Sequence, residues 1–194
     1  MSKMSISLRA TLAAALLGGA TLALAPTTGS AQEKTVTVGG APMYPSKTIV
    51  ENAVNSKDHT TLVAAVKAAG LVDTLSGKGP FTVFAPTNDA FAKLPAGTVD
   101  TLVKPDKKAT LTKILTYHVV PGTHSGADIM KAIKAGNGKA AMKTVEGEEL
   151  TFTMAGPAVE IIDAKGGKSK VTIADVNQSN GVIHVVDTVL MPKS

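Results

Sequence analysis

The hydrophobic pattern changes halfway along the chain, and this change restricts the fold more than any other feature. Between residues 46 and 120 most apolar side chains recur at helical spacing, as in Leu62, Val63 and Val66. After a short helical segment at 127–134, runs of β-forming residues alternate with glycine turns, at 140–145, 150–154, 159–163, 170–174 and 182–190. Helices followed by strands favour an α+β domain over a doubly wound parallel sheet, in which the two would alternate.

The last run, residues 182–190, predicts a central strand. Apolar side chains occupy both alternating sets of positions, which is typical of a strand covered on both faces. His184 and Asp187 are its ionisable groups, and Asn180 and Gly181 form the turn before it. This run is also the longest of the predicted strands.

An earlier strand at residues 81–85 is followed by a short helix. Pro86 ends the strand, and Thr87 is placed to cap the helix. Thr87, Asn88 and Asp89 can satisfy the free amides of its first turn, so a structural role accounts for these three residues.

The first 31 residues have the pattern of a secretory signal peptide. Lys3 and Arg9 precede an uncharged stretch at 10–25, which is shorter than the about 20 apolar residues that a membrane-spanning helix needs. Small residues at the junction predict cleavage after Ala31. The product would be secreted, to the periplasm or to the extracellular space.

Residues 32–45 predict an extended linker, because glycines and prolines interrupt any apolar period, and the domain then covers residues 46–192. The sequence contains no cysteine, which excludes disulfide scaffolds, thiolate metal sites and cysteine nucleophiles. Without the first 31 residues, 18 basic and 15 acidic side chains remain, a formal charge of +3. This small charge and the scarcity of aromatic residues do not favour nucleic-acid binding.

Three segments together resemble the signature motifs of the fasciclin domain family. They are 79–91 (GPFTVFAPTNDAF), 117–120 (YHVV) and 180–192 (NGVIHVVDTVLMP). Residues 48–51 and 61–75 resemble the N-terminal part of the domain, so the resemblance spans about 46–192. It implies helices packed around a wedge of two β-sheets, in a family of secreted or surface-held adhesion proteins, with a bacterial single-domain member as the best fit.

The resemblance also identifies a candidate binding site. In animal members of the family the tyrosine-histidine pair is implicated in integrin-mediated adhesion, which makes Tyr117 and His118 the favoured contact residues here. Branched apolar neighbours complete the site: Ile114, Leu115, Val119 and Val120. A structural role is the alternative, since the pair ends a predicted helix whose dipole would favour a cationic His118. A further hypothesis pairs Asp89 with His118.

Other chemical motifs are absent or incomplete. The four histidines show no metal-ligand spacing, and residues 175–181 depart from a calcium loop, so we expect no metal and no cofactor. The lysines at 104, 107, 108 and 113, and at 131, 134, 139 and 143, would allow contact with anionic polysaccharide or lipid headgroups, although a solvated surface explains them equally.

Two functions remain open at this point. The favoured one is a secreted, non-enzymatic adhesion module that binds a protein or glycan of the cell envelope or of a host surface. Bridging two surfaces would then require a homo-oligomer, a second binding face or a tether. The alternative is a small-ligand carrier or a hydrolase-type enzyme with a pocket near Asp89, His118 or His184. A pocket shared by His184 and Asp187 would support the alternative, and close packing of His184 would oppose it.

Overall fold

The computed structural model describes residues 35–193. The predicted signal peptide and its cleavage site after Ala31 lie outside the described residues. Within the described part, no helix is long and apolar enough to cross a bilayer. Most helices precede most strands, which confirms the predicted α+β class.

Seven strands form one mixed sheet in the order β4-β3-β9-β8-β7-β6-β5. The pair β3 and β9 is parallel, and the five other neighbouring pairs are antiparallel. The strands are β3 (Phe81–Pro86), β4 (Val119–Pro121), β5 (Lys139–Lys143), β6 (Glu149–Ala155), β7 (Ala158–Ile162), β8 (Lys168–Gln178) and β9 (Gly181–Val186).

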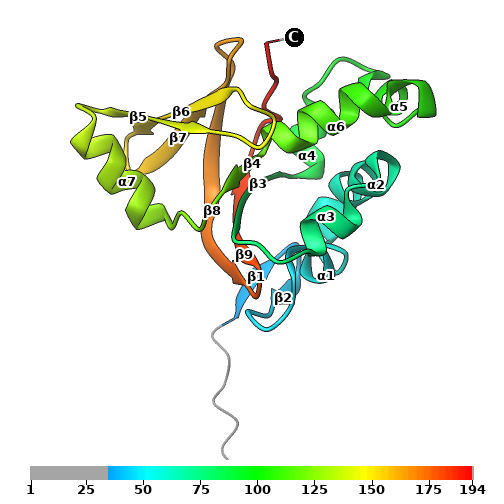
Figure 1. The fold of residues 1–194 in the computed structure, drawn as a ribbon, viewed down its shortest axis with the longest axis horizontal. Coiled ribbons are helices and arrows are strands. Elements are labelled where there is room, and N and C mark those ends of the chain that lie inside the picture. The colour runs from blue at the N-terminus through cyan, green and yellow to red at the C-terminus, as the bar shows by residue number, and fades with distance from the viewer. Residues whose placement is uncertain (1–34, 194) are drawn as a thin grey trace, which may run out of the picture. The chain divides into compact units, whose positions relative to one another are not determined.

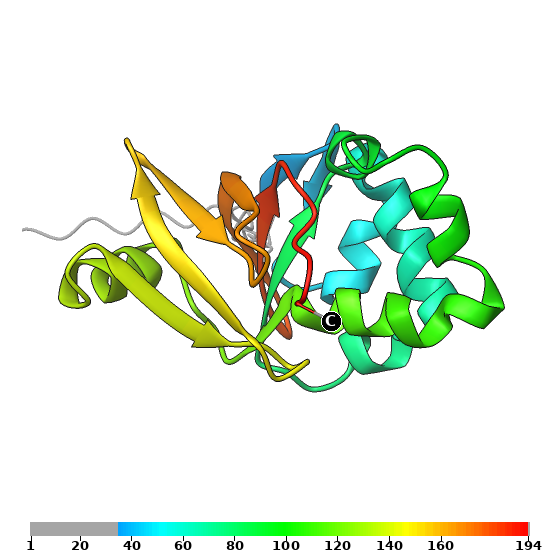
Figure 2. The same cartoon turned by 90° about the horizontal axis from the view of Figure 1, so that it is seen from above.

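Strand β8 belongs to both halves of this sheet. Residues 168–170 pair with β7, whereas residues 171–178 pair with β9. The register with β9 shifts twice along the strand, and such irregularities bend a strand and increase its twist. The two halves therefore diverge as a wedge (Figure 2), which confirms the arrangement that the family resemblance implies.

The helices cover the two halves unequally (Figure 1). One group gathers beside β3 and β9: α1 (Ile49–Ala53), α2 (Thr60–Ala69), α3 (Val72–Ser76), α4 (Asn88–Ala92), α5 (Thr98–Leu102) and α6 (Lys108–Tyr117), with 3-10 turns at Lys57–His59 and Pro105–Lys107. Helix α7 (Gly126–Ala135) instead packs against β5 and β6.

The apolar interior consists of two clusters, one on each face of β3 and β9. Side chains alternate between the faces of a strand, so Val83 and Val185 contribute to the cluster under the helices. Phe84 and Val186 point the other way, into the wedge, where they join Phe152 and other apolar residues. Residues 182–186 are all buried, which confirms the prediction of a central, doubly covered strand.

Two details of the predicted strands are wrong. The last strand ends at Val186, and the longest strand is β8 with 11 residues. Residues 175–178 follow the predicted run 170–174 but belong to β8, because Asp175 accommodates a local irregularity with a φ of 58° and the strand then continues.

The prediction of an extended linker is wrong for residues 36–43. They form a hairpin of β1 (Val36–Val38) and β2 (Ala41–Met43), joined by Gly39 and Gly40 with positive φ. Val38 and Met43 are each 3% exposed and belong to the cluster under the helices. The hairpin is therefore part of the domain, because it covers apolar surface that would otherwise face water.

The two outermost strands of the seven-stranded sheet approach each other at one end. The Val145 N–H, just after β5, donates a hydrogen bond of 2.8 Å to the Val119 carbonyl of β4. Beyond this contact, β4 ends at Pro121, which has no N–H to donate. Strand β5 carries two exposed lysines, Lys139 and Lys143.

Candidate functional site

Tyr117, the first residue of the predicted binding pair, is fully buried at the end of α6. Its hydroxyl donates to the Glu149 carbonyl at 3.1 Å and accepts from the Ala164 N–H at 2.9 Å. Burial raises the pKa of Tyr117 to about 12, so the hydroxyl remains a donor at all physiological pH values. Tyr117 thus connects α6 to two distant segments of the wedge.

We expect Tyr117→Phe to lower the free energy of unfolding by about 2 kcal/mol, because one backbone donor and one backbone acceptor lose their partner while the ring still packs. Urea unfolding monitored by circular dichroism measures the difference. Tyr44→Phe is the control, since Tyr44 is 37% exposed, whereas Tyr117 is fully buried. Equal midpoints for wild type and Tyr117→Phe would contradict this structural role.

His118 is also buried, with 2% of its surface exposed. The Leu190 N–H donates to Nε2 at 3.0 Å, so Nε2 carries a lone pair and the proton resides on Nδ1, which donates to the Ile114 carbonyl at 2.8 Å. Burial lowers the pKa of His118 to about 4. The expectation of a cationic histidine is therefore wrong, because loss of hydration outweighs the attraction of the helix end.

The neighbours of the pair are interior as well. Ile114, Leu115, Val119 and Val120 are each at most 4% exposed. The six residues favoured as a binding surface therefore do not form one in the described structure. Their apolar side chains fill both clusters instead, because α6 and β4 cross between the helices and the wedge.

The predicted pair of Asp89 and His118 does not form. Asp89 is exposed on α4, whereas both nitrogens of His118 are bound to backbone groups. The other polar residues of this motif are structural. Thr87 caps α4 through a 3.2 Å bond from the Ala90 N–H, as predicted. Asn88 accepts from the Thr61 N–H at the start of α2 and donates to the Lys57 carbonyl in the preceding 3-10 turn.

Asn180 and Gly181 hold the β8–β9 turn against the helices. The Asn180 carboxamide accepts from the Ile49 N–H at 3.0 Å and donates to the Leu75 carbonyl at 2.8 Å and to the Gly77 carbonyl at 3.0 Å. A Cβ atom on Gly181 would lie 2.0 Å from the Phe81 carbonyl oxygen, so glycine permits the close approach of β3.

His184 and Asp187 lie apart and share no pocket. His184 is fully buried, stacks on Phe84, and binds the His124 carbonyl through Nε2 at 2.8 Å. Burial lowers its pKa. Asp187 accepts a 2.9 Å bond from the Lys170 N–H and lies 3.6 Å from the Lys93 ammonium. Close packing of His184 opposes the pocket that the alternative function required.

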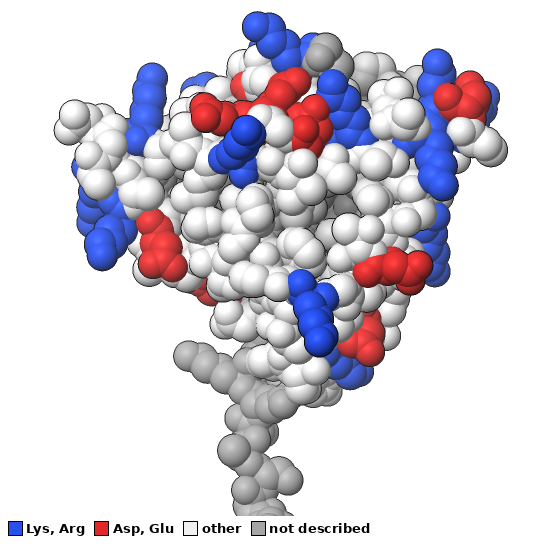
Figure 3. Space-filling view, in the orientation of Figure 1, with Lys and Arg blue, Asp and Glu red and all other residues white. Residues whose placement is uncertain are grey.

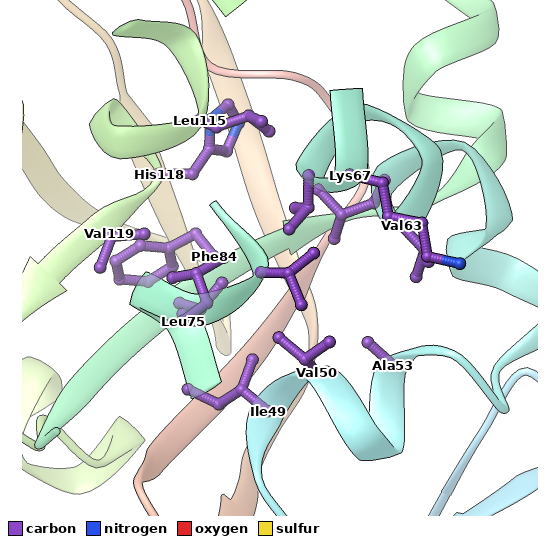
Figure 4. Close-up of a pocket in the computed structure, with 14 residues that line it drawn as sticks. Ile49, Val50, Ala53, Val63, Lys67, Leu75, Phe84, Leu115, His118 and Val119 are labelled. Carbon is purple, nitrogen blue, oxygen red and sulfur yellow. The ribbon is translucent and has the colours of Figure 1, made fainter. Parts of the chain in front are cut away.

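Two hollows combine residues that no sequence motif brings together. The first is a narrow apolar cavity of about 40 Å³ between α1, α2, α3, β3 and the end of α6 (Figure 4). The second is an open, polar hollow of about 600 Å³ at the β8–β9 turn, lined in part by Thr48, Lys78, Thr123, Asn177 and Ser179. Because these residues come from separate segments, the sequence alone did not indicate either hollow.

Charged side chains are dispersed over the surface. On the face shown in Figure 3, the region over β3 and α3 is largely free of charge. Positive lysines and negative carboxylates lie around it. Lys113 pairs with Glu146 at 3.3 Å and Lys168 with Glu160 at 3.2 Å. No group of three or more histidine, aspartate or glutamate side chains in residues 35–193 is arranged to hold a metal ion.

Fold and site together define a class: an α+β module with a split sheet, whose motif residues bind its own backbone. The chain belongs to the fasciclin family, whose domain model matches residues 57–192. It is 49% identical over 160 residues to Protein sll1483 of Synechocystis sp., covering 82% of each chain. It is 38% identical over 145 residues to the cell surface glycolipoprotein MPB83 of Mycobacterium bovis, covering 72% of this chain and 58% of the relative.

A solved structure has the same fold. It is the FAS1 domain pair of the insect cell adhesion molecule fasciclin I, which superposes with a TM-score of 0.66 at 22% identity. The match covers 76% of this chain and 52% of the pair.

Proposed function

We propose that this protein is a secreted, non-enzymatic interaction module that binds a protein or glycan of the cell envelope or of a host surface. The observation that carries the proposal is the internal use of the motif side chains: Tyr117, His118 and Asn180 are each bound to backbone groups. Side chains occupied in this way do not act on a substrate, so contacts with a partner fall to the exterior. The name of the mycobacterial relative, a cell surface glycolipoprotein, supports an exported location.

The polar hollow replaces the Tyr117–His118 pair as the proposed contact site. Lys78, Thr123, Asn177 and Ser179 are exposed there. Hydroxyl, amide and ammonium groups of this kind both donate and accept hydrogen bonds, which suits the hydroxyl groups of a glycan or the backbone of a protein. Adhesion further requires a second contact, which self-association would supply.

Binding of the exported protein to immobilised envelope fractions tests this proposal. The protein is recovered from cells expressing the full chain. Its measured intact mass is expected to equal that of a chain that begins at Gln32. Lys78→Glu/Asn177→Ala should weaken retention by about tenfold, because a charge and an amide contact are lost. Lys134→Glu is the control, since it makes the same charge change on an exposed residue of α7.

Tyr117→Ala/His118→Ala separates the two candidate sites. We expect this variant to lose its folded circular dichroism signal together with binding, since both residues are structural. A Tyr117→Ala/His118→Ala protein that is folded but no longer binds would support the Tyr117–His118 pair as the binding site. If Lys78→Glu/Asn177→Ala is retained as fully as wild type, the polar hollow is not the contact site. A wild-type protein that binds no envelope component would refute the adhesion proposal.

A further inference from the structure

The apolar cavity beside α1, α2 and α3 is larger than the space that one water molecule occupies. Protein interiors are close-packed and contain few voids larger than a water molecule. Atoms that line a void lose dispersion contacts, so an unfilled cavity lowers stability. The side chains in Figure 4 converge on this space from three short helices and from β3.

The interior of the cavity offers no polar group to a ligand. Leu75, Val83 and Leu115 contribute apolar side chains. His118 also lines the cavity, but both of its nitrogens are bound to backbone groups, so the ring presents carbon. An occupant must therefore be apolar where it enters.

The rim differs from the interior in having one charge. Val50, Val63 and Val72 line the cavity and are half-buried, and Val54, the residue one turn after Val50, is 48% exposed. Lys67 is exposed, and its ammonium points away from the cavity in Figure 4. No carboxylate of residues 35–193 lies within ion-pair distance of Lys67. The rim thus combines apolar valine side chains with the ammonium group of Lys67, which has no carboxylate partner in the described residues.

We propose that this cavity binds an unbranched alkyl chain that carries an anionic head group. The chain enters between the valines towards Leu115 and His118, and the head group pairs with Lys67 at the surface. The small volume of the cavity, about 40 Å³, suits a single chain rather than a ring system. Helices α1 and α3 have only five residues each, so small shifts can widen the opening. This inference is independent of the proposed envelope contact.

Titration with alkyl carboxylates tests the proposal directly. The mature protein, with ¹³C-labelled valine and leucine methyl groups, is titrated with hexanoate, octanoate and decanoate. We expect saturable shifts at Val50, Val63, Leu75 and Leu115. Affinity should rise by about fourfold with each added CH₂ until the cavity is full. Absence of saturable shifts with all three acids, or shifts confined to other parts of the protein, would overturn the proposal.

Two variants examine the tail and the head group separately. Ala53→Leu adds carbon atoms inside the cavity, which Ala53 lines, and should weaken octanoate binding by about tenfold or more while the protein stays folded. Lys67→Ala should weaken octanoate by about threefold to fivefold and leave octanol unchanged. Lys131→Ala, an exposed lysine on α7, is the matched control. Octanoate binding that is unaffected by Ala53→Leu would place the ligand elsewhere and refute the assignment.

Vesicles distinguish the two sources of such a chain. Binding to phosphatidylglycerol vesicles but not phosphatidylcholine vesicles, abolished by Ala53→Leu, would identify the acyl chain of an anionic lipid. Octanoate binding without vesicle binding would identify a free acid. Either result supports the cavity as the site, whereas vesicle binding that survives Ala53→Leu in a protein that binds no octanoate contradicts it.

Discussion

Replacement of Asn180 by alanine is expected to lower the free energy of unfolding by about 3 kcal/mol. The carboxamide makes three hydrogen bonds to backbone groups, at the Ile49 N–H and at the Leu75 and Gly77 carbonyls. Each bond contributes about 1 kcal/mol, and partly buried groups left without a partner add to the loss. Urea unfolding with an unchanged m-value would assign the shift to the native state.

Two further variants show whether the hydrogen bonds are responsible. Asn180→Asp keeps an acceptor for the Ile49 N–H but places carboxylate oxygen against two carbonyls, so we expect it to be at least as unstable as Asn180→Ala. Asn177→Ala, three residues earlier on an exposed position, should remain within about 0.5 kcal/mol of wild type. A loss below 1 kcal/mol in Asn180→Ala would show that the β8–β9 turn is held mainly by other contacts.

Acid is expected to destabilise the domain through its buried histidines. The pKa of His118 is about 4 in the folded protein because of burial, against 6.5 for an exposed histidine. Between these values the unfolded chain binds a proton that the native state does not bind. Stability is therefore fully present above pH 6.5 and falls as the pH decreases towards 4, by about 3 kcal/mol from this residue. Burial lowers the pKa of His59 and His184 as well, which adds to the effect.

Thermal unfolding from pH 8 to pH 4 measures this dependence. His118→Asn should be less stable than wild type at pH 7, because the Leu190 N–H loses its acceptor, and its pH dependence should be flatter. His124→Gln should follow wild type, since the bonds of His124 to Thr82 and His184 use its backbone. Asp89→Asn should also follow wild type, because the exposed Asp89 carboxylate makes no hydrogen bond to His59, His118 or His184. A slope that is the same in His118→Asn and wild type would contradict the assignment.

The architecture followed from the sequence to a large extent, because burial periodicity is a local signal. Apolar residues on both faces of 182–186 predicted the centre of the sheet, and Thr87 predicted a helix start that the structure confirms. The β1–β2 hairpin was missed because glycines and prolines were taken as marks of a linker. Two glycines between short apolar runs are also a hairpin signal. The apolar Val36 and Val38 directly before Gly39 and Gly40 fit that signal.

The candidate site was harder to predict, because its residues depend on partners far away in the chain. Ala164 and Leu190, which bind Tyr117 and His118, are 47 and 72 residues distant from them. Local sequence places the pair at a helix end but does not show that the wedge and the C-terminal segment close over it. The same reason accounts for the wrong pairing of Asp89 with His118, since neither local pattern specifies which way α4 faces.

The way the sheet ends at its two borders limits how copies of this domain can associate. Val145 occupies the carbonyl of Val119 on one border strand, and the exposed lysines of β5 would repel a second copy placed along the other. Neither border therefore offers a template for adding strands from a neighbouring molecule. Copies of the domain therefore associate through their faces, and growth into fibrils by addition of strands at the sheet borders is not favoured.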